Sequence, residues 1–326
     1  MKILAIGGAG YIGSHVVRTL IDKGHDVTVY DSLYSGLKEN IQPESRLIEG
    51  DILDYVHLRD TLAQGYEAVF HFAALKAANE SMTKVEKYSV NNITGTINML
   101  NAMCETNVNR LVFSSTAAVY GEPQYVPIDE KHPLNPENYY GFTKLEIERI
   151  LHWYDTLKGI RVATLRYFNA AGYDIFGRVK GLERNPQNLL PIIMEVAAGW
   201  RPKLAIYGSD WDTPDGTCIR DYVHVNDLAD GHVRALDYIA AKNESLLVNL
   251  GSESGISVKA MIEKARDITG EKIPADMAPR RFGDPARVVA SSEKAEELLG
   301  WKAKYSDVST LISTTWNVYK DLRRFC

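Results

Sequence analysis

The sequence predicts an α/β protein built on a doubly wound parallel sheet, with a smaller, interleaved C-terminal α/β lobe. Short apolar runs alternate with helix-like stretches through the first half of the 326 residues. These runs are apolar throughout, which is typical of parallel strands that are covered on both faces. After residue 169 the alternation becomes irregular, and we expect the second lobe to begin there.

The elements of the first half follow one another in a regular order. Helices are predicted from IGSHVVRTLIDKG and over residues 91–106 and 140–157. Strands are predicted from the runs KILAI, VTVYD, RLIEGD, AVFHFA, LVFSS and RVATLRYF. Strands separated by helices indicate crossover connections and hence a parallel sheet with helices on both faces.

The second half predicts smaller elements around a long loop. Residues 172–191 are rich in Gly, Asn and Pro, and a loop of this length is usually functional or mobile. The loop is followed by a helix near 192–198, the strand LAIYG and a strand–helix–strand unit over 219–251. After these we expect two small helices, a strand near 287–290 and a tail helix over 308–323. We expect residues 1–170 to form one domain, with 219–251 rejoining its sheet, and residues 171–326 to form mainly a second lobe.

Composition excludes several classes of function. The net charge of -5 provides no global basic field, so nucleic acid is not an expected partner. Cys104, Cys218 and Cys326 are scattered, which argues against disulfides and a zinc site and favours reduced cytosolic thiols. The eight histidines show no metal-binding spacing, and no apolar run is long enough to span a membrane. We therefore expect a cytoplasmic protein without a metal.

The stretch GGAGYIG joins the first predicted strand to the first predicted helix. Gly7, Gly10 and Gly13 form a G-x-x-G-x-x-G turn. Glycines at this place let a pyrophosphate approach the backbone amides at the positive end of a helix. The turn therefore predicts a dinucleotide site, although a purely structural turn between strand and helix remains an alternative.

Asp31 strengthens the prediction of a dinucleotide site. It ends the second predicted strand, eighteen residues after Gly13, where a carboxylate accepts hydrogen bonds from the adenine ribose. A carboxylate repels a 2′-phosphate, so NAD is favoured over NADP. The alternative is that Asp31 only initiates the turn before Ser32.

Tyr140 and Lys144 are four residues apart at the start of a predicted helix, so their side chains lie on one face. A nearby ammonium favours the phenolate, and such a pair exchanges a proton with a sugar hydroxyl. The preceding strand LVFSS ends beside Ser115 and Thr116, either of which is placed to hydrogen-bond the same hydroxyl. Tyr and Lys at this spacing also occur as ordinary surface residues.

The sequence resembles the extended short-chain dehydrogenase/reductase family through GGAGYIG, Asp31, GDI, HFAALK, SSTAAVYG and YGFTK. The match covers essentially the whole chain and is close to the UDP-sugar 4-epimerase branch, through RYFNAAG, QNLLP, LAIYG, DGTCIRDYVHVNDLADGH and APRRFGD. The resemblance implies a Rossmann-like fold, bound NAD and reversible epimerisation at C4 of UDP-glucose and UDP-galactose. It also implies a homodimer formed through the helices over 91–106 and 140–157.

The resemblance assigns roles to individual positions. It implies that Tyr140 is the proton-transferring base, that Lys144 lowers its pKa and holds the nicotinamide ribose, and that Thr116 assists. The positions implied for NAD are Gly7, Gly10, Tyr11, Ile12, Gly13, Asp31, Ser32, Ser35, Gly36, Asp51, Ile52, Phe72, Ala73, Ala74, Lys76, Asn91, Ser114, Tyr140, Lys144 and Phe168. Those implied for the UDP-sugar are Lys76, Thr116, Tyr140, Asn169, Asn188, Leu189, Tyr207, Arg220, Arg281 and Asp284.

Two departures from family patterns bear on the reaction. Ala117 and Ala118 stand where related dehydratases carry an Asp-Glu pair, which disfavours dehydration. Val288 aligns with a position that is a bulky tyrosine in some epimerases and small in those that accept N-acetylated sugars, so UDP-N-acetylglucosamine is an alternative substrate. The sequence also leaves open an epimerase of UDP-glucuronate and a non-catalytic NAD-binding regulator.

Overall fold

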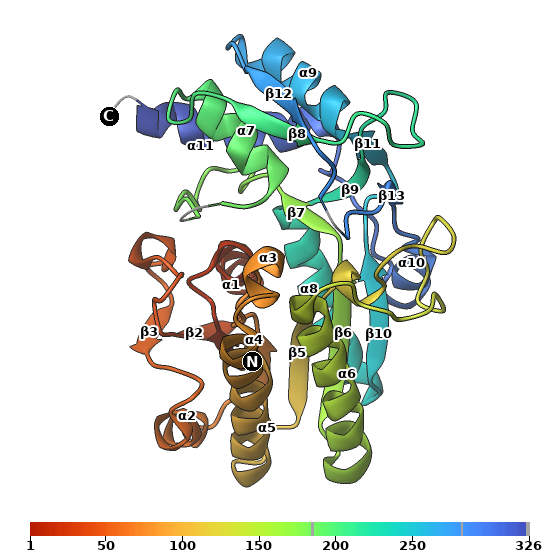
Figure 1. Cartoon of the computed structure of the whole chain (residues 1–326). Helices are drawn as coiled ribbons and strands as arrows, with labels where there is room; N and C mark the ends of the chain where they lie inside the picture. The colour runs from red at the N-terminus through yellow and green to blue at the C-terminus, as the bar shows by residue number, and fades with distance from the viewer. Residues whose placement is uncertain (184–185, 282, 324–326) are drawn as a thin grey trace.

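The computed structural model describes residues 1–183, 186–281 and 283–323. In Figure 1 the main sheet and its helices form the lower part of the molecule, and the second lobe lies above it. The thiols of Cys104 and Cys218 are free, and Cys326 lies outside the described residues. Among the described residues, no helix combines the length and the apolar character needed to cross a membrane.

The main sheet has seven strands, all parallel, in the order β10-β6-β5-β4-β1-β2-β3. The chain adds β2 and β3 on one side of β1 and the later strands on the other, so the winding direction reverses between β1 and β4. Ligands bind at such a switch point in open parallel sheets. The strands are β1 (Lys2–Ile6), β2 (Asp26–Asp31), β3 (Arg46–Glu49), β4 (Ala68–His71), β5 (Arg110–Thr116), β6 (Arg161–Tyr167) and β10 (Leu246–Leu250).

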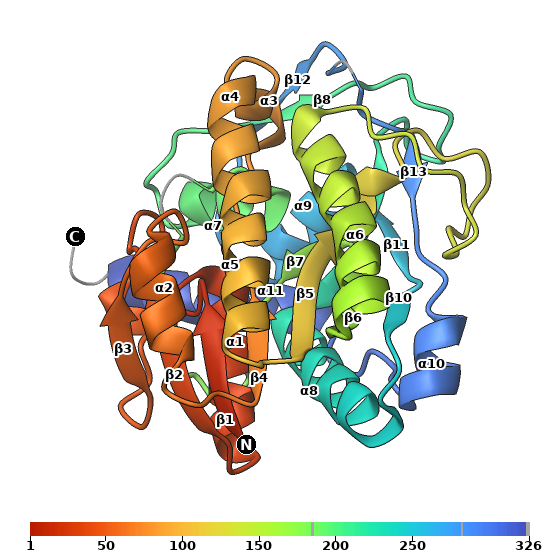
Figure 2. The ribbon, with the colours of Figure 1, turned by 90° about the horizontal axis from the view of Figure 1, so that it is seen from below.

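Helices cover both faces of this sheet, as the apolar strands predict (Figure 2). One face packs against α1 (Tyr11–Asp22) and α8 (Val225–Lys242), and the other against α2 (Tyr55–Leu62), α5 (Gly95–Glu105) and α6 (Tyr139–Lys158). The two faces have separate apolar cores, with Val29 and Leu228 in one core and Leu111 and Met99 in the other. The sheet is therefore rigid, and it fixes the loops at its carboxyl edge.

Short elements lie at the carboxyl edge of the main sheet. A π-helical segment, η2, leads directly into α5. These elements are η1 (Lys38–Asn40), α3 (Ala78–Ser81), α4 (Val85–Tyr88), η2 (Ser89–Thr94) and η3 (Ala117–Val119).

The second lobe has two small sheets and a core of its own. In one sheet β9 (Ile219–His224) pairs with β7 (Asn169–Ala171), β11 (Gly255–Ser257) and β13 (Arg287–Val288). In the other, β8 (Leu204–Tyr207) pairs with β12 (Ala275–Ala278). The helices of this lobe are α7 (Leu189–Ala197), α9 (Val258–Thr269) and α11 (Val308–Arg323), whereas α10 (Glu293–Leu299) packs against α8 and β10 in a core of the main sheet.

The segment 219–251 divides between the two lobes. Its last strand, β10, pairs with β6 in the main sheet, and α8 packs on that sheet. Its first strand, β9, is not a strand of the main sheet. Instead it pairs with β7, which follows β6 after the single residue Phe168 and carries the chain out of the main sheet.

Candidate active site

A cleft of about 870 Å³ opens at the carboxyl edge of the main sheet. Every position named above for NAD lines this cleft, from the glycine turn to Phe168. Thr116, Asn169 and Asn188, which were named for the UDP-sugar, line it as well. Residues from the ends of β1, β2, β5 and β6 and from the second lobe thus meet at the topological switch point, where a dinucleotide site is expected.

The glycine turn fits closely between β1, α1 and the segment after β4. Gly7 has a φ of +80°, and a Cβ atom there would lie 2.5 Å from the amide nitrogen of Ala73. A Cβ atom on Gly13 would lie 2.4 Å from the carbonyl oxygen of Gly7. No side chain of the described residues caps α1, because its N-cap residue is Gly10. The first amides of α1 are therefore available to an anion.

Asp31 is 8 % exposed and lies beside the glycine turn. Its Oδ2 accepts a hydrogen bond from the amide of Ala9 at 2.9 Å, and its Oδ1 accepts one from the amide of Leu33 at 2.8 Å. Burial raises the pKa of the Asp31 carboxyl, while these two hydrogen bonds lower it. A carboxylate has about four acceptor sites, so capacity for ribose hydroxyls remains.

Tyr140 lies on α6 at the wall of the cleft, and α6 begins at a well-fixed point. The side chain of Asn138 accepts a hydrogen bond from the amide of Gly141 at 2.9 Å, and the amide of Tyr140 donates to Ser81 Oγ at 3.0 Å. Burial raises the pKa of the Tyr140 phenol to about 12, and a hydrogen bond with the Thr116 side chain acts in the opposite direction. The phenol is therefore harder to ionise in this cleft than it would be in water.

Lys144 is buried one turn further along α6. Its Nζ donates to the carbonyl oxygen of Ser114 at 2.8 Å and lies 4.7 Å from the centre of the Phe113 ring. Burial lowers the pKa of the Lys144 ammonium to about 7, and the negative charge of Glu148 acts in the opposite direction. In this structure burial and the Thr116 hydrogen bond account for the shift of the Tyr140 pKa, and the lowering by Lys144 stays a prediction.

The π-helix η2 contributes to the wall of the cleft through Val90 and Asn91. Asn92 is buried within it and bonds both the amide and the carbonyl oxygen of Leu75, at 2.8 and 3.0 Å. Its Nδ2 also donates to Thr143 Oγ1 on α6, at 3.1 Å. The neighbouring Asn91 lines the cleft and donates to Asn92 Oδ1 at 3.0 Å. Single π-turns of this kind are frequent at functional sites.

The remaining positions named for the UDP-sugar are not part of the cleft lining. Leu189 is the first residue of α7. The other four form an arginine cluster in the second lobe. Arg281 Nε donates to Asp284 at 2.8 Å and its guanidinium lies 4.5 Å from the Tyr207 ring centre, while Arg220 lies 3.6 Å from Asp284. Two arginines share one carboxylate here, which leaves donors for phosphate oxygens.

Several residues of the cleft were not predicted from the sequence. Asn40 is buried, accepts from the amide of Gly181 at 3.0 Å and donates to the carbonyl oxygen of Ala9 at 3.1 Å. Glu183 forms an ion pair with Lys76, and both line the cleft. Neither Asn40 nor Glu183 lies in a motif; their roles depend on partners more than one hundred residues away in the sequence.

A family model described as the NAD dependent epimerase/dehydratase family matches residues 3–251. The chain belongs to this family. The match includes the glycine turn, Asp31 and the Tyr140–Lys144 pair, and it ends one residue after β10. It therefore covers all of the main sheet except the first residue of β1, together with the cleft-lining segments between its strands.

Individual members of the family resemble the chain over nearly its full length. The UDP-glucose 4-epimerase of Lacticaseibacillus casei is 47% identical over 323 residues, 98% of this chain and 97% of its own. The crystal structure of UDP-glucose 4-epimerase from Brucella ovis in complex with NAD has a TM-score of 0.95 at 40% identity and covers 98% of each chain. The Stenotrophomonas maltophila UDP-glucose-4-epimerase with bound NAD and formylated UDP-arabinopyranose has a TM-score of 0.96 at 37% identity, with 100% of each chain covered.

The residues present fit the cofactor of this epimerase/dehydratase family. A Cβ atom on Gly10 would meet only the Gly7 carbonyl oxygen, so the turn is open at this position; α1 offers uncapped amides, and the Asp31 carboxylate retains acceptor capacity. A diphosphate requires the first two features and an adenine ribose requires the third. In the described ranges 1–183, 186–281 and 283–323, no group of three or more His, Cys, Asp or Glu side chains is arranged to hold a metal ion.

Proposed function

We propose that this protein interconverts UDP-glucose and UDP-galactose by reversible epimerisation at C4, with bound NAD and with Tyr140 as the proton-transferring base. The observation that carries the proposal is that Tyr140 and the glycine turn line one cleft, with a hydrogen bond between the side chains of Tyr140 and Thr116. The near full-length similarity to UDP-glucose 4-epimerases supports this function over a non-catalytic regulator.

The proposed reaction begins with removal of a proton from the sugar. Lys144 and bound NAD would favour the phenolate form of Tyr140, which accepts the proton of the 4-hydroxyl, and the Thr116 hydroxyl hydrogen-bonds the same oxygen. NAD would be held by the glycine turn, Asp31 and Lys144, and it would supply the hydride acceptor and donor for C4. Tyr140 then gives the proton back to the oxygen, so that acid and base are the same residue in opposite directions.

Inversion requires that the sugar turn between the two transfers while the nucleotide stays in place. The arginine cluster supports this, since Arg220 and Arg281 bind a diphosphate through paired donors. Asn188, which lines the cleft, and Leu189, the first residue of α7, are assigned to the UDP-sugar in this proposal. If UDP is held firmly and the hexose loosely, the 4-keto sugar presents its second face for hydride return.

In this proposal each lobe binds a different molecule. Residues 1–170, together with α8 and β10, hold NAD, and the remainder of 171–326 holds mainly the UDP-sugar. The assignment rests on the position of the glycine turn and Asp31 in one lobe and of the arginine cluster in the other.

One assay tests the function directly. The purified protein, without added NAD, is incubated with UDP-galactose, and UDP-glucose is quantified by chromatography. Conversion establishes C4 epimerisation with a cofactor that the protein retains and regenerates. Absence of conversion with and without added NAD overturns the proposal.

A homodimer and a cytoplasmic location complete the proposal. Trp153 and Leu157 on α6 are 60% and 68% exposed, and this apolar surface beside α5 suits the helix-to-helix contact that the family resemblance implies. Sedimentation of the wild type and of Trp153→Glu tests the dimer, since the charge should yield monomers.

The free thiols of Cys104 and Cys218 agree with a reducing compartment, and cell fractionation tests the cytoplasmic location.

A further inference from the structure

Residues 172–183, which we call the strap, run from β7 in the second lobe back to the main sheet half. At the beginning of the strap, the carbonyl oxygen of Gly172 accepts a hydrogen bond from the Tyr11 hydroxyl at 2.5 Å. At its far end, Gly181 is hydrogen-bonded to Asn40, and Glu183 is paired with Lys76. Gly181, Leu182 and Glu183 line the cleft, so the strap forms part of its wall.

The far end of the strap lies beside the adenosine part of the proposed NAD site. A Cβ atom on Gly181 would lie 2.2 Å from Asn40 Oδ1, so the two residues are in close contact. Asn40 in turn donates to the carbonyl oxygen of Ala9, whose amide bonds the ribose-binding candidate Asp31. Displacement of the strap would therefore open the cleft at this end.

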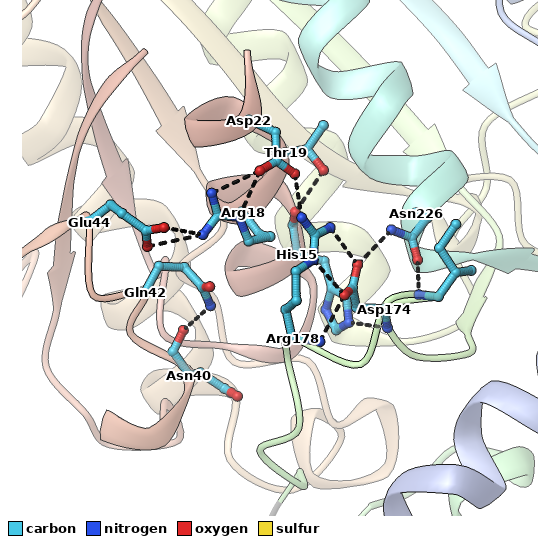
Figure 3. A network of polar contacts seen from close by, with 11 residues as sticks. His15, Arg18, Thr19, Asp22, Asn40, Gln42, Glu44, Asp174, Arg178 and Asn226 are labelled. Atoms are coloured by element: carbon cyan, nitrogen blue, oxygen red, sulfur yellow. Dashed lines mark hydrogen bonds and ion pairs between the residues drawn. The ribbon is translucent and has the colours of Figure 1, made fainter. Parts of the chain in front are cut away.

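The middle of the strap is fastened to α1 by a polar network, shown in Figure 3. Arg178 donates to both oxygens of Asp174 at 2.9 Å and, through Nη1, to Asp22 Oδ2 on α1 at 2.7 Å. The amide of Asp174 donates to His15 Nε2 at 3.1 Å, and Asn226 on α8 donates to Asp174 at 3.2 Å. Arg178 is thus the residue that joins the strap carboxylate to the helix carboxylate.

Asp174 and His15 are the buried members of the network, whereas the side chains of Arg178 and Asp22 are 35% and 40% exposed. The Asp174 side chain is 1% exposed, so its negative charge requires a partner, and hydrogen bonds from Arg178 and Asn226 overcome the effect of burial to lower its pKa to about 2. His15 accepts through Nε2 while its Nδ1 faces the carbonyl oxygen of Tyr11 at 2.7 Å, which requires the neutral ring. Tyr11, His15, Arg18 and Asp22 follow the i, i+4, i+7, i+11 spacing of one helix face.

We propose that the strap retains NAD in the cleft and that Arg178, by joining Asp174 to Asp22, is the positioning residue that sets how slowly NAD leaves. This inference rests on the proposed function, because it takes NAD as the occupant of the cleft. Arg178 does not line the cleft, and it acts through the strap. A cofactor that is regenerated within each catalytic cycle has no need to dissociate, and a fastened strap keeps it in place between cycles.

The test compares a variant of the Arg178 contact with a matched control. Arg178→Met alone would leave a buried carboxylate without its partner, so it is combined with Asp174→Asn, which keeps an acceptor for Asn226. The control is Arg18→Met with Glu44→Gln. Arg18 bonds the same Asp22 on α1 at 2.8 Å and Glu44 at 3.0 Å, and neither of these contacts involves the strap.

The readout is the dissociation rate of NAD, which does not depend on turnover. Holoenzyme carrying radiolabelled NAD is mixed with excess unlabelled NAD, and the label retained after rapid gel filtration is followed over time. We expect roughly tenfold faster loss from Arg178→Met/Asp174→Asn, the effect of one charge-assisted contact, and a change below about twofold in the control. Arg178→Lys should restore part of the retention, since it keeps the charge but loses the paired geometry.

The outcomes separate this inference from the proposed function. Equal NAD dissociation rates in the wild type and Arg178→Met/Asp174→Asn overturn the proposal that the strap retains NAD, even if UDP-galactose is converted. Equal acceleration in the control also overturns it, because a general weakening of α1 would then explain the result. Slow release of NAD from the wild type without conversion of UDP-galactose overturns the proposed epimerase function. The role of the strap is then still decided by comparing the NAD dissociation rates of the wild type and Arg178→Met/Asp174→Asn.

Discussion

A Cβ atom on Gly13 would lie 2.4 Å from the carbonyl oxygen of Gly7 and 2.9 Å from the Cα of Gly8, whereas one on Gly10 would meet only the Gly7 oxygen, at 3.3 Å. The glycines of one turn therefore serve different purposes. Gly13 allows α1 to approach the turn itself, and Gly10 keeps the space above the turn free. We therefore expect Gly13 to matter for folding and Gly10 for binding of the cofactor.

Gly13→Ala and Gly10→Ala should accordingly fail in different ways. Gly13→Ala should lower the free energy of unfolding by roughly 1–3 kcal/mol, because backbone atoms have to move. Gly10→Ala should change stability little but weaken NAD binding by tenfold or more, since the methyl group occupies the space of the diphosphate. Urea denaturation of the apoprotein and calorimetric titration with NAD measure the two effects. Equal losses of stability in both variants would contradict the distinction.

Tyr140→Phe should lower turnover by roughly 100-fold or more, the usual size of general acid–base catalysis, with nucleotide binding preserved. The matched control is Tyr139→Phe. Tyr139 precedes Tyr140 on the same helix, but its hydroxyl bonds Ser89 Oγ at 2.6 Å and it does not line the cleft. Turnover and UDP affinity are measured for both variants. A wild-type turnover rate in Tyr140→Phe would contradict the assignment of Tyr140 as the proton-transferring base.

Arg281→Met should weaken UDP binding by roughly tenfold and raise the KM for the UDP-sugar, because it removes a paired phosphate donor. Arg280→Met is its control. Arg280 is adjacent in the sequence, yet its guanidinium bonds Asp210 at 2.8 Å and lies 4.0 Å from the Trp211 ring centre. Calorimetry with UDP distinguishes the two variants, and equal affinities would remove Arg281 from the binding site.

Stability should fall as the pH drops below neutrality, because four histidines are buried in the neutral form. Burial lowers the pKa of His15 and His232 to about 4, and that of His71 and His224 to about 3, from an ordinary value of 6.5. The unfolded state thus binds more protons than the native state from about pH 6.5 down to about 4 for His15 and His232, and down to about 3 for His71 and His224. The stabilisation is complete above this window and is lost as the pH falls through it.

The expected loss between pH 7 and pH 5 is roughly 2 kcal/mol for each of these histidines. Urea midpoints at pH 7, 6 and 5 measure it. His71→Leu provides the comparison, because His71 packs against Phe113 and its Nδ1 has no hydrogen-bond partner among the described residues. This variant should show a shallower pH dependence than the wild type; an unchanged slope would mean that His71 takes up its proton in the native state.

The fold and the centre of the site were predictable because local signals encode them. Apolar runs specified the parallel sheet, and Gly7, Asp31 and Tyr140 stand at strand ends or a helix start that the chain itself marks. Asn40 and Glu183 carry no such mark, since their partners Gly181 and Lys76 come from distant segments. The Tyr140 pKa was also beyond local reasoning, because the burial that raises it is a property of the assembled cleft.

The main departure from prediction concerns strand pairing. The segment 219–251 has the apolar pattern of strand, helix and strand, but pattern alone does not name a partner for β9. The partner is decided by β7, a strand of only three residues that the sequence did not indicate. The π-helix η2 is likewise absent from the prediction, because its sequence SVNNIT continues the helical pattern of α5.

The division of β9 and β10 between the lobes bears on how such enzymes diversify. The chain leaves the main sheet after β6, returns for α8 and β10, and leaves again, so the second lobe is not one continuous insert. A chimera that acquires another specificity by exchanging this lobe must exchange at least two separated segments and preserve the edge strand between them. Gene fusion at a single crossover cannot do so, and gradual substitution within the segments remains the accessible route to a new sugar.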